Sequence, residues 1–328
     1  MNKVFVTGGT GLLGARVLEQ LHQTGLYEIH ALKRAESDLR LLGDIANEIT
    51  WYNGDILDYD LMEICIEGSH FVFHCAAMVS FDPRDVEMMM DINVEGTAQL
   101  VDICLEKNIH KLIHVSSIAA LGAAAEGKTQ IDEDCQWVDN GQQSNYSRSK
   151  FLSEMEVHRG IAEGLNAAIV NPSVILGVGF PEKGSTKLFK NVKKGFPYYS
   201  EGETGFVSAE DVARFMILLA ESDIVDQRFI LSEGNYSYKQ IFDWIAEGFG
   251  VAKPHKKVGF FVRELAWRLD YIRCLFTGAR PLLTKETTRS AFQKQAYDSA
   301  KSQTVGNFSY TSMAKSINEH CKALKDIL

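Results

Sequence analysis

The sequence lacks an excess of positive charge, paired cysteines and a long hydrophobic run. Its 34 Lys and Arg are outnumbered by 43 Asp and Glu, and the net charge of −9 argues against a nucleic-acid-binding protein, which needs a basic face. The six cysteines show no CxxC spacing, so we expect them to pack as small hydrophobic residues in a reducing compartment. No stretch approaches the ~20 apolar residues of a membrane span.

Metal-binding and targeting signals are missing as well. No HExxH or mixed Cys/His cluster is present, so no metal site is expected, and His74 and His114 are interpreted as core histidines. The first expected strand begins at residue three or four, which leaves no room for a signal peptide, and we expect a cytoplasmic protein. A length of 328 residues predicts two domains at ~150 residues per domain.

A strand, a glycine-rich turn and a helix open the chain. The apolar run at residues 3–7 passes into the turn 8–14, and a helical pattern follows at residues 15–21. Gly9, Gly11 and Gly14 fit the dinucleotide fingerprint, in which glycines let the backbone approach a pyrophosphate. The start of the helix adds free N–H groups and a partial positive charge. We expect this turn to bind a dinucleotide through Gly8, Thr10, Gly11, Leu12, Leu13 and Gly14.

Strands alternate with helices through the first half of the chain. Strands are expected at 27–32, 49–53, 71–77, 111–115 and 166–171, helices at 91–107 and 145–163, and a loop at 126–144. This alternation predicts parallel βαβ units and an α/β fold with a Rossmann doubly wound sheet. After residue 177 the pattern loosens into helices, with a strand at 228–231. We predict an NADP-binding domain at 1–176, to which 205–232 returns, and a smaller, mostly helical substrate-binding domain from 177–204 and 233–328.

The acidic residue that selects an unphosphorylated cofactor is missing from its usual place. Such an Asp or Glu follows the second strand, about 20 residues past the glycines. This chain has Lys33 and Arg34 there, and its nearest acids, Glu36 and Asp38, come later. The two cations could be solvated charges at a strand end, but their spacing favours contact with the 2′-phosphate of NADP, with NAD as the alternative.

Two places read Tyr-x-x-x-Lys, a spacing that puts both side chains on one face of a helix. Tyr146 and Lys150 follow a strand that ends at Ser117, and ligands bind at that end of open sheets. Tyr297 and Lys301 follow no strand, and we interpret them as structural.

Tyrosine, serine and lysine can together assist the reduction of a carbonyl group when a hydride arrives at its carbon from the cofactor. A phenol with a pKa of ~10 is a poor acid near neutrality, so we expect Lys150 to lower the pKa of Tyr146 and to reach the cofactor ribose. Tyr146 would then exchange a proton with the substrate oxygen, which Ser117 would hold. Such acid–base help is worth about 10²–10⁴ in rate.

Ordered motifs cover nearly the whole chain: Thr7–Gly14, Gly54–Ile56, His74–Ala77, Asn93–Thr97, Val115–Ser117, Tyr146–Lys150, Asn171–Ser173 and Phe206–Ala213. In this order they resemble the extended short-chain dehydrogenases/reductases of the NAD-dependent epimerase/dehydratase superfamily. The chain is most similar to the branch of dihydroflavonol reductases and hydroxysteroid dehydrogenases. The ordered set is far more specific than any one motif.

The resemblance implies a role for each matching residue. Ser117, Tyr146 and Lys150 would be the catalytic triad, and Asn93 would brace the active-site backbone. In this branch a basic residue after the second strand goes with NADP, in agreement with Lys33 and Arg34. Some relatives form homodimers through the helices that begin near residues 91 and 145, and others are monomers. Further cofactor contacts would come from Asp55, Ile56, Ala76, Ala77, Pro172 and Ser173.

Three functions follow from these residues. The leading one is an NADP-dependent oxidoreductase that acts on a ketone, an aldehyde or the alcohol of a partly apolar small molecule. The alternative is a nucleotide-sugar epimerase with tightly bound NAD. Dehydration is disfavoured because family dehydratases carry an acid pair directly after the catalytic hydroxyl residue, where this chain has Ile118 and Ala119. A non-enzymatic NADP sensor is the least favoured, since such relatives often lose the Tyr or Lys.

One apolar stripe is not explained by the chemistry described above. Its members follow one face of an expected helix over residues 260–276: Phe261, Leu265, Leu269, Ile272 and Phe276. We consider core packing of the second domain, a substrate lid, and contact with a membrane surface.

Overall fold

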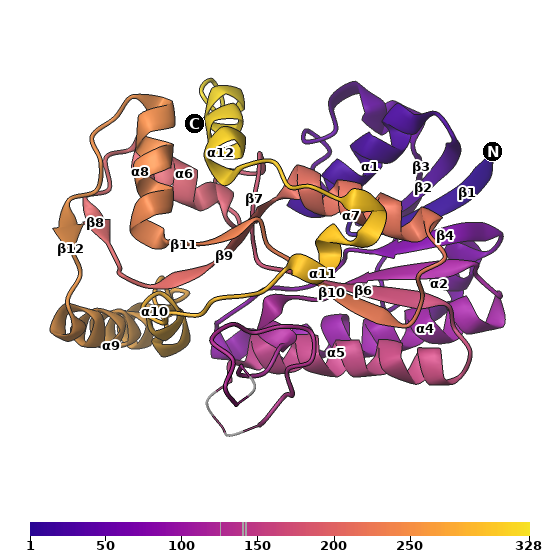
Figure 1. The fold of residues 1–328 in the computed structure, drawn as a ribbon, viewed down its shortest axis with the longest axis horizontal. Helices are drawn as coiled ribbons and strands as arrows, with labels where there is room; N and C mark the ends of the chain where they lie inside the picture. Colours follow the sequence, from indigo (N-terminus) through magenta and orange to yellow (C-terminus); the bar gives the residue numbers. More distant parts are fainter. Residues whose placement is uncertain (125, 140, 142) are drawn as a thin grey trace.

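The computed structural model describes residues 1–124, 126–139, 141 and 143–328 (Figure 1). In these residues a central sheet of seven parallel strands has the order β10-β6-β5-β4-β1-β2-β3. Read from the β3 edge, the first six strands follow the Rossmann order 3-2-1-4-5-6, and β10 extends the sheet beyond β6. The strands are β1 (Asn2–Thr7), β2 (Tyr27–Lys33), β3 (Thr50–Asn53), β4 (Ser69–His74), β5 (Lys111–Val115), β6 (Ala167–Pro172) and β10 (Gln227–Leu231).

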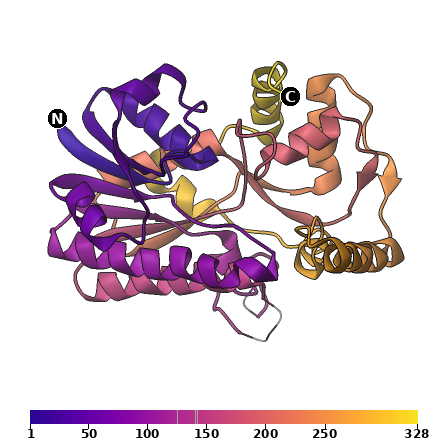
Figure 2. The same ribbon diagram turned by 180° about the vertical axis from the view of Figure 1, so that it is seen from behind.

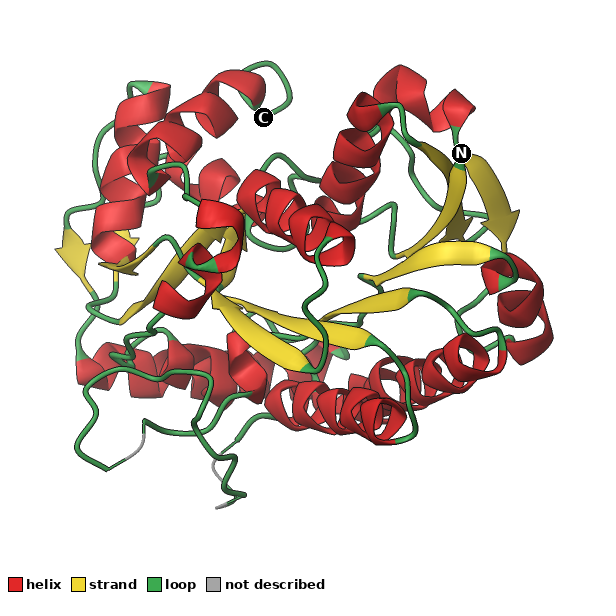
Figure 3. Cartoon of the chain, turned by 45° about the vertical axis from the view of Figure 1, so that its right-hand side comes forward, coloured by secondary structure: helices red, strands yellow, loops and turns green. Residues whose placement is uncertain are grey.

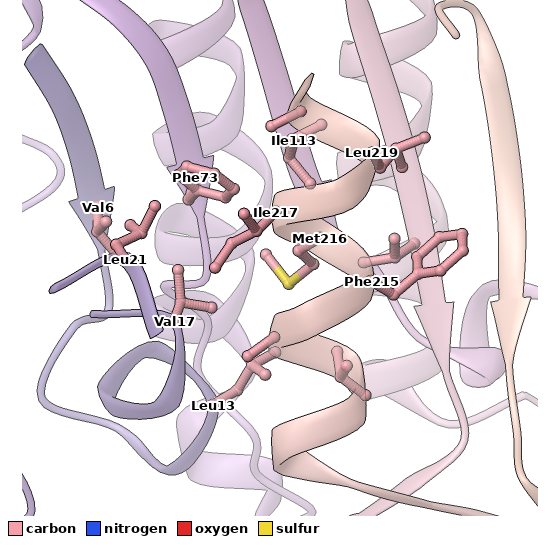
Figure 4. Packing of buried hydrophobic residues seen from close by; sticks show 14 of the residues in the cluster. Val6, Leu13, Val17, Leu21, Phe73, Ile113, Phe215, Met216, Ile217 and Leu219 are labelled. Carbon is pink, nitrogen blue, oxygen red and sulfur yellow. The ribbon is translucent and has the colours of Figure 1, made fainter. Parts of the chain in front are cut away.

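Helices cover both faces of this sheet (Figure 3). On one face α1 (Leu12–Thr24) packs beside α7 (Ala209–Glu221), and residues of both lie in one hydrophobic cluster with the strands. Figure 4 shows Val17 and Leu21 of α1 facing Met216 and Ile217 of α7, with Phe73 of the sheet between them. The other face carries α2 (Tyr59–Ile66), α4 (Gly96–Glu106) and α5 (Asn145–Ala162).

The alternating side chains of β1 explain why both faces must be covered. Val4 and Val6 belong to the cluster under α1 and α7, whereas Phe5 belongs to the cluster on the opposite face. Successive residues of a strand point to opposite faces, so a strand that is apolar at every position is buried on both sides. The α/β fold with a doubly wound parallel sheet, which the alternation predicts, is confirmed.

A smaller second lobe lies beyond the carboxyl ends of the strands (Figures 1 and 2). Its own hydrophobic cluster joins α6, α8 and α12 to a three-stranded sheet of order β11-β9-β7. A two-stranded sheet, β12-β8, and two more helices, α9 and α10, complete the lobe. The elements of this lobe have the bounds β7 (Val174–Leu176), α6 (Thr186–Lys193), β8 (Tyr198–Tyr199), β9 (Glu203–Ser208), β11 (Gly234–Ser237), α8 (Tyr238–Phe249), β12 (Lys256–Lys257), α9 (Phe260–Thr277), α10 (Lys285–Ser290) and α12 (Met313–Ala323). Helix α11 (Ala300–Gln303) contacts β10 of the central sheet.

Several expected elements have different bounds. The strand expected at 71–77 ends at His74, and the helix expected at 91–107 starts earlier, with α3 (Val86–Met90) and a π-helical turn, η3 (Asp91–Glu95), before α4. The expected loop at 126–144 is irregular where it is described; residues 140 and 142 lie outside the description. Strands β7, β9 and β11 were not predicted, because they are short and lie in the segment where periodicity is weak.

The interpretation of the 260–276 stripe as core packing is wrong. The stripe lies on α9, and its five apolar residues are 46–87% exposed. They are absent from the lining of the large cleft described below, so they do not form a lid over it in this structure.

Candidate active site

The turn between β1 and α1 is shaped by two glycines. Gly8 has a φ of 69°, and a Cβ there would lie 2.6 Å from the backbone nitrogen of Ala76. A Cβ on Gly14 would lie 2.2 Å from the carbonyl oxygen of Gly8. The N-cap of α1 is Gly11, which offers no side-chain cap, so the first N–H groups of the helix face the turn uncapped. This cradle suits the pyrophosphate of a dinucleotide.

A cleft of about 990 Å³ opens beside this turn at the carboxyl ends of the central strands. Its volume is at the upper end of small-molecule sites, which span roughly 300–1,000 Å³. Most of the predicted site residues line it: Gly8, Gly11, Leu12, Leu13, Gly14, Ala77, Ser117, Tyr146, Lys150, Pro172 and Ser173. The predicted residues outside its lining are Thr10, Lys33, Arg34, Asp55, Ile56, Ala76 and Asn93.

Ser117, Tyr146 and Lys150 meet inside this cleft. Tyr146 and Lys150 are one helical turn apart on α5, whose N-terminus is capped by the Ser144 hydroxyl. Ser117 follows β5 by two residues, and its hydroxyl acts on the Tyr146 phenol to lower the pKa of that phenol. Lys150 is buried, and its Nζ donates to the carbonyl oxygen of Val115 at 2.7 Å. A phenol, a hydroxyl and an ammonium group therefore converge from two elements.

The pKa values at this site differ from the sequence expectation. Burial raises the pKa of Tyr146, and the hydrogen bond with Ser117 only partly offsets this effect. Burial also lowers the pKa of Lys150 to about 8. The expectation that Lys150 lowers the pKa of Tyr146 is thus wrong for this structure, since removal from water dominates. The phenol is protonated at neutral pH.

Asn93 connects the loop after β4 to the catalytic helix. It lies in the π-helical turn η3, a feature frequent at functional sites. Its Oδ1 accepts from the backbone nitrogen of Met78 at 2.7 Å, and its Nδ2 donates to the Met78 carbonyl at 2.9 Å. The same Nδ2 donates to the Ser149 hydroxyl at 2.9 Å, and that hydroxyl donates to the Tyr146 carbonyl at 2.9 Å. Asn93 therefore positions backbone and does not line the cleft.

His74 continues this network toward the glycine turn. The Thr97 hydroxyl donates to the carbonyl of Asn93 at 2.7 Å, so it accepts from Nε2 of His74 at 3.0 Å. Nδ1 of His74 accepts from the Thr7 hydroxyl at 2.7 Å, which itself accepts from the Ala76 nitrogen at 3.2 Å. Burial lowers the pKa of His74 to about 3, so the ring is neutral with its proton on Nε2. In the described part of the chain, no group of His, Cys, Asp or Glu side chains is placed to hold a metal ion.

One helical turn beyond Lys150, the buried carboxylate of Glu154 pairs with the partly buried Arg228. Glu154 accepts from the Ser116 hydroxyl at 2.7 Å and from Asn171 Nδ2 at 2.9 Å. Its other oxygen is 3.0 Å from Nη1 of Arg228 on β10. Burial alone would raise the pKa of Glu154, but these hydrogen bonds and the nearby His158 and Arg228 lower it overall. Sequence reasoning missed Glu154, although its spacing from Tyr146 and Lys150 was a usable signal.

Lys33 and Arg34 lie at the carboxyl end of β2. Strand β2 pairs with β1, the strand that leads into the glycine turn. The Lys33 carbonyl accepts from the Gly54 nitrogen at 3.0 Å, which brings the Asp55 and Ile56 segment next to it. Asp55 is exposed, and its Oδ1 accepts from the Leu57 nitrogen at 3.1 Å. The Arg34 guanidinium is exposed, 3.4 Å from Glu36. Arg34 and Asp55 form an exposed rim outside the lining of the cleft, whereas Ile56 is buried in the core.

The second Tyr-x-x-x-Lys pair is held apart from the first. Tyr297 is buried and its hydroxyl donates to Gln295 Oε1 at 3.1 Å, although it borders the cleft. Lys301 points elsewhere: its Nζ donates to the Arg228 carbonyl at 3.0 Å and lies over the Phe229 ring. The pair therefore makes separate packing contacts and forms no second catalytic group.

The rest of the cleft mixes apolar and polar side chains. Phe81 lies edge-on to Tyr146 with ring centroids 6.0 Å apart, and Val79 continues the same wall. The second lobe contributes the opposite wall, which sequence reasoning did not predict: Glu203, Thr204, Tyr238, Lys285, Glu286, Arg289, Ser290, Gln293 and Gln295.

A doubly wound sheet whose glycine turn opens onto such a cleft defines a Rossmann enzyme that uses a dinucleotide. A model of the NAD-dependent epimerase/dehydratase family matches residues 4–230. The chain belongs to this family and is an enzyme of the extended short-chain dehydrogenase/reductase type.

Named relatives of the chain include reductases. It is 27% identical over 304 residues to a Synechocystis protein named "Putative dihydroflavonol 4-reductase", covering 90% of this chain and 87% of that one. It is 26% identical over 261 residues to cinnamoyl-CoA reductase 2 of Arabidopsis thaliana, covering 75% and 77%. The structure of UDP-glucose 4-epimerase from Thermus thermophilus, in complex with NAD, superposes with a TM-score of 0.77 at 19% identity over 99% of this chain and 100% of that one. At that identity the likeness shows the shared fold.

Proposed function

We propose that the protein is an NADP-dependent reductase of a ketone or aldehyde on a partly apolar small molecule, working through Ser117, Tyr146 and Lys150. The observation that carries this proposal is the convergence of these side chains in one cleft beside the glycine turn. The reductase names of the relatives point the same way.

The chain's own residues would handle the proton and the oxygen. A bound nicotinamide cofactor would supply the hydride, and the glycine turn would hold its pyrophosphate. Ser117 would donate a hydrogen bond to the substrate oxygen. Tyr146 stays protonated at neutral pH because burial raises its pKa, so it is in the correct state to donate a proton during reduction. Lys150 would reach the cofactor ribose, and Asn93 and Ser149 would keep the start of α5 in place.

Exchanging Tyr146 for Phe tests the proposed acid. Tyr146→Phe removes only the hydroxyl, so we expect NADPH binding to persist while turnover of a carbonyl substrate falls by about 10²–10⁴. Cofactor binding is measured by fluorescence titration, and turnover by NADPH oxidation with a panel of ketones and aldehydes. Tyr271→Phe, at an exposed position outside the lining of the cleft, is the matched control and keeps most of its activity. Equal turnover of the Tyr146→Phe variant and the wild type would show that another group is the acid.

The preference for NADP rests on the cations after β2. A 2′-phosphate needs a charged donor at this rim, and a charge-assisted hydrogen bond contributes about 1.5–3 kcal/mol. Within the described residues, the exposed Arg34 guanidinium pairs only with the exposed Glu36, and such surface pairs are weak.

Arg34→Gln is expected to weaken NADPH binding by roughly tenfold to a hundredfold and to leave NADH binding unchanged. Arg40→Gln is the control, because Asp38 already holds that guanidinium through two oxygens. Titration of wild type and variants with both cofactors is the measurement. Equal wild-type affinities for NADPH and NADH would refute the assignment.

Epimerisation of a nucleotide sugar is the second candidate, favoured by the family description itself. An epimerase regenerates its cofactor in each cycle, so it would retain bound NAD through purification and show no net NADPH oxidation. Mass spectrometry of the denatured protein distinguishes the two functions. The two-domain division, a cytoplasmic location and a homodimer stay predictions.

A further inference from the structure

Helix α9 presents its apolar stripe to solvent. Figures 1 and 2 show it as a straight helix along the outer edge of the second lobe, away from the central sheet. Besides the stripe, Val262 and Leu275 are exposed, as are Leu282 and Leu283 just beyond the helix. A contiguous exposed apolar surface of this kind is unusual for a surface helix and marks an interaction site.

The side of α9 that faces the protein carries Asp270 and Arg263 together with the partly buried Trp267 and Cys274. Asp270 is only 9% exposed, and its Oδ2 accepts from the backbone nitrogens of Leu282 and Leu283 at 2.7 and 3.0 Å. The Arg263 side chain is mostly buried over the Phe292 ring. An amphipathic helix of a soluble lobe normally turns its apolar face inward. In this protein, the contacts of Asp270 and Arg263 keep the apolar stripe turned toward solvent. The stripe is therefore available to contact another surface.

Positive charge surrounds this stripe. Residues 253–294 contain ten Lys and Arg but three Asp and Glu, a net charge of +7 in a chain of net charge −9. Four acids from neighbouring elements, Asp82, Asp85, Glu201 and Glu247, pair with cations of this segment, and an excess of positive charge remains. Lys256 and Arg268 are among its exposed cations.

This surface is also joined to the cleft. Arg280, just after α9, binds Asp85 at 2.6 Å, and Arg84 Nη1 donates to the Gly278 carbonyl at 3.1 Å. The loop that carries Asp85 and Arg84 includes Val79 and Phe81, which line the cleft. Helix α10, next to α9, supplies Lys285 and Arg289 to the opposite wall.

We propose that α9 and its flanking cations dock the protein on an anionic membrane surface. The exposed apolar side chains would enter the headgroup and acyl boundary while the cations pair with lipid phosphates. No helix in the described residues is long and apolar enough to cross a bilayer. In the proposed state, α9 would lie in the plane of the membrane surface. A second copy of this chain is a poorer occupant, because a two-fold interface would place two surfaces with an excess of positive charge against each other. The proposal does not depend on the reaction catalysed.

Binding to vesicles tests the proposal with the full-length protein. We expect co-sedimentation with vesicles of equal parts phosphatidylcholine and phosphatidylglycerol, and little with pure phosphatidylcholine. Leu265→Ser with Ile272→Ser should lower the partition coefficient by roughly 30-fold, since two aliphatic side chains then no longer leave water. Lys256→Gln with Arg268→Gln should weaken binding by roughly tenfold or more and reduce its salt dependence.

The matched control is Leu26→Ser with Ile64→Ser, which removes two equally exposed aliphatic side chains from the sheet-bearing part of the molecule. It should bind vesicles like the wild type. All four altered apolar positions are exposed, so thermal unfolding should be unchanged. Absence of binding to the anionic vesicles, or equal binding by the α9 variant and its control, would overturn the proposal. A wild-type dimer in sedimentation velocity that Leu265→Ser with Ile272→Ser converts to a monomer would assign the stripe to a second copy instead.

Discussion

A buried ammonium group sets the electrostatics of this site. Lys150 is 2% exposed, and its Nζ is held by the Val115 carbonyl with Glu154 one turn away. Burial penalises the charged form and lowers its pKa from 10.5 to about 8. The folded protein therefore bears a cost for keeping Lys150 charged, and that cost is fully present below pH 8. Above pH 8 the folded protein releases the Lys150 proton, and the cost decreases until about pH 10.5, where the unfolded chain releases the same proton.

Lys150→Met should reveal this linkage. Between pH 8 and 10.5 the free energy of unfolding of the wild type should rise relative to that of the variant, by on the order of 3 kcal/mol in total. Urea unfolding at a series of pH values measures the difference. Lys187→Met, at an exposed position of α6, should show a constant difference from the wild type over the same range. A constant difference for Lys150→Met as well would mean that burial does not perturb this lysine.

At the scale of one element, α1 can pack closely against the turn before it because Gly8 and Gly14 have no side chains. Gly14 lies in the first turn of α1, against the carbonyl of Gly8, and neither partner is a flexible side chain that could move away. Backbone-to-backbone contact of this kind brings the N–H groups of the helix to the cleft.

Gly14→Ala should therefore separate the helix from the turn. We expect a loss of about 1–3 kcal/mol in the free energy of unfolding, the usual cost of overpacking, together with weaker cofactor binding. Gly259→Ala is the control, since a Cβ there meets nothing within 4 Å, and its effect should stay below about 1 kcal/mol. Chemical denaturation compares them; equal stabilities would show that the turn can shift without cost.

At the scale of the whole molecule, Arg228 joins segments far apart in the chain. From β10 it bonds Glu154 on α5, and its Nη2 donates to the Cys135 carbonyl at 2.8 Å in the loop after β5. Glu133 from the same loop accepts from the Ile230 nitrogen at 2.8 Å. The edge strand, the catalytic helix and the loop after β5 are thus connected through one partly buried guanidinium.

Arg228→Met should destabilise the fold by about 3–5 kcal/mol, because it leaves the Glu154 carboxylate buried without its cation. Adding Glu154→Gln should recover part of the loss, since the remaining group is then neutral. Arg159→Met breaks a surface cluster with Asp102, Glu156 and Glu163 and should cost less than about 1 kcal/mol. Urea unfolding measures the free energy of unfolding of the wild type and of the three variants. Similar small losses for Arg228→Met and Arg159→Met would contradict the structural role of Arg228.

The sequence by itself determined what depends on local chemistry. The glycine turn, the central strands and the shared helix face of Tyr146 and Lys150 follow from backbone sterics and from periods of 2 and 3.6 residues. Only the tertiary structure decided what each side chain meets. Arg228 reaches Glu154 from 74 residues away, and burial raises the pKa of Tyr146 where sequence reasoning expected Lys150 to lower it. Likewise, periodicity identifies the stripe of α9 but not the direction it faces, because an amphipathic pattern defines a face of a helix and leaves its partner to be chosen by packing.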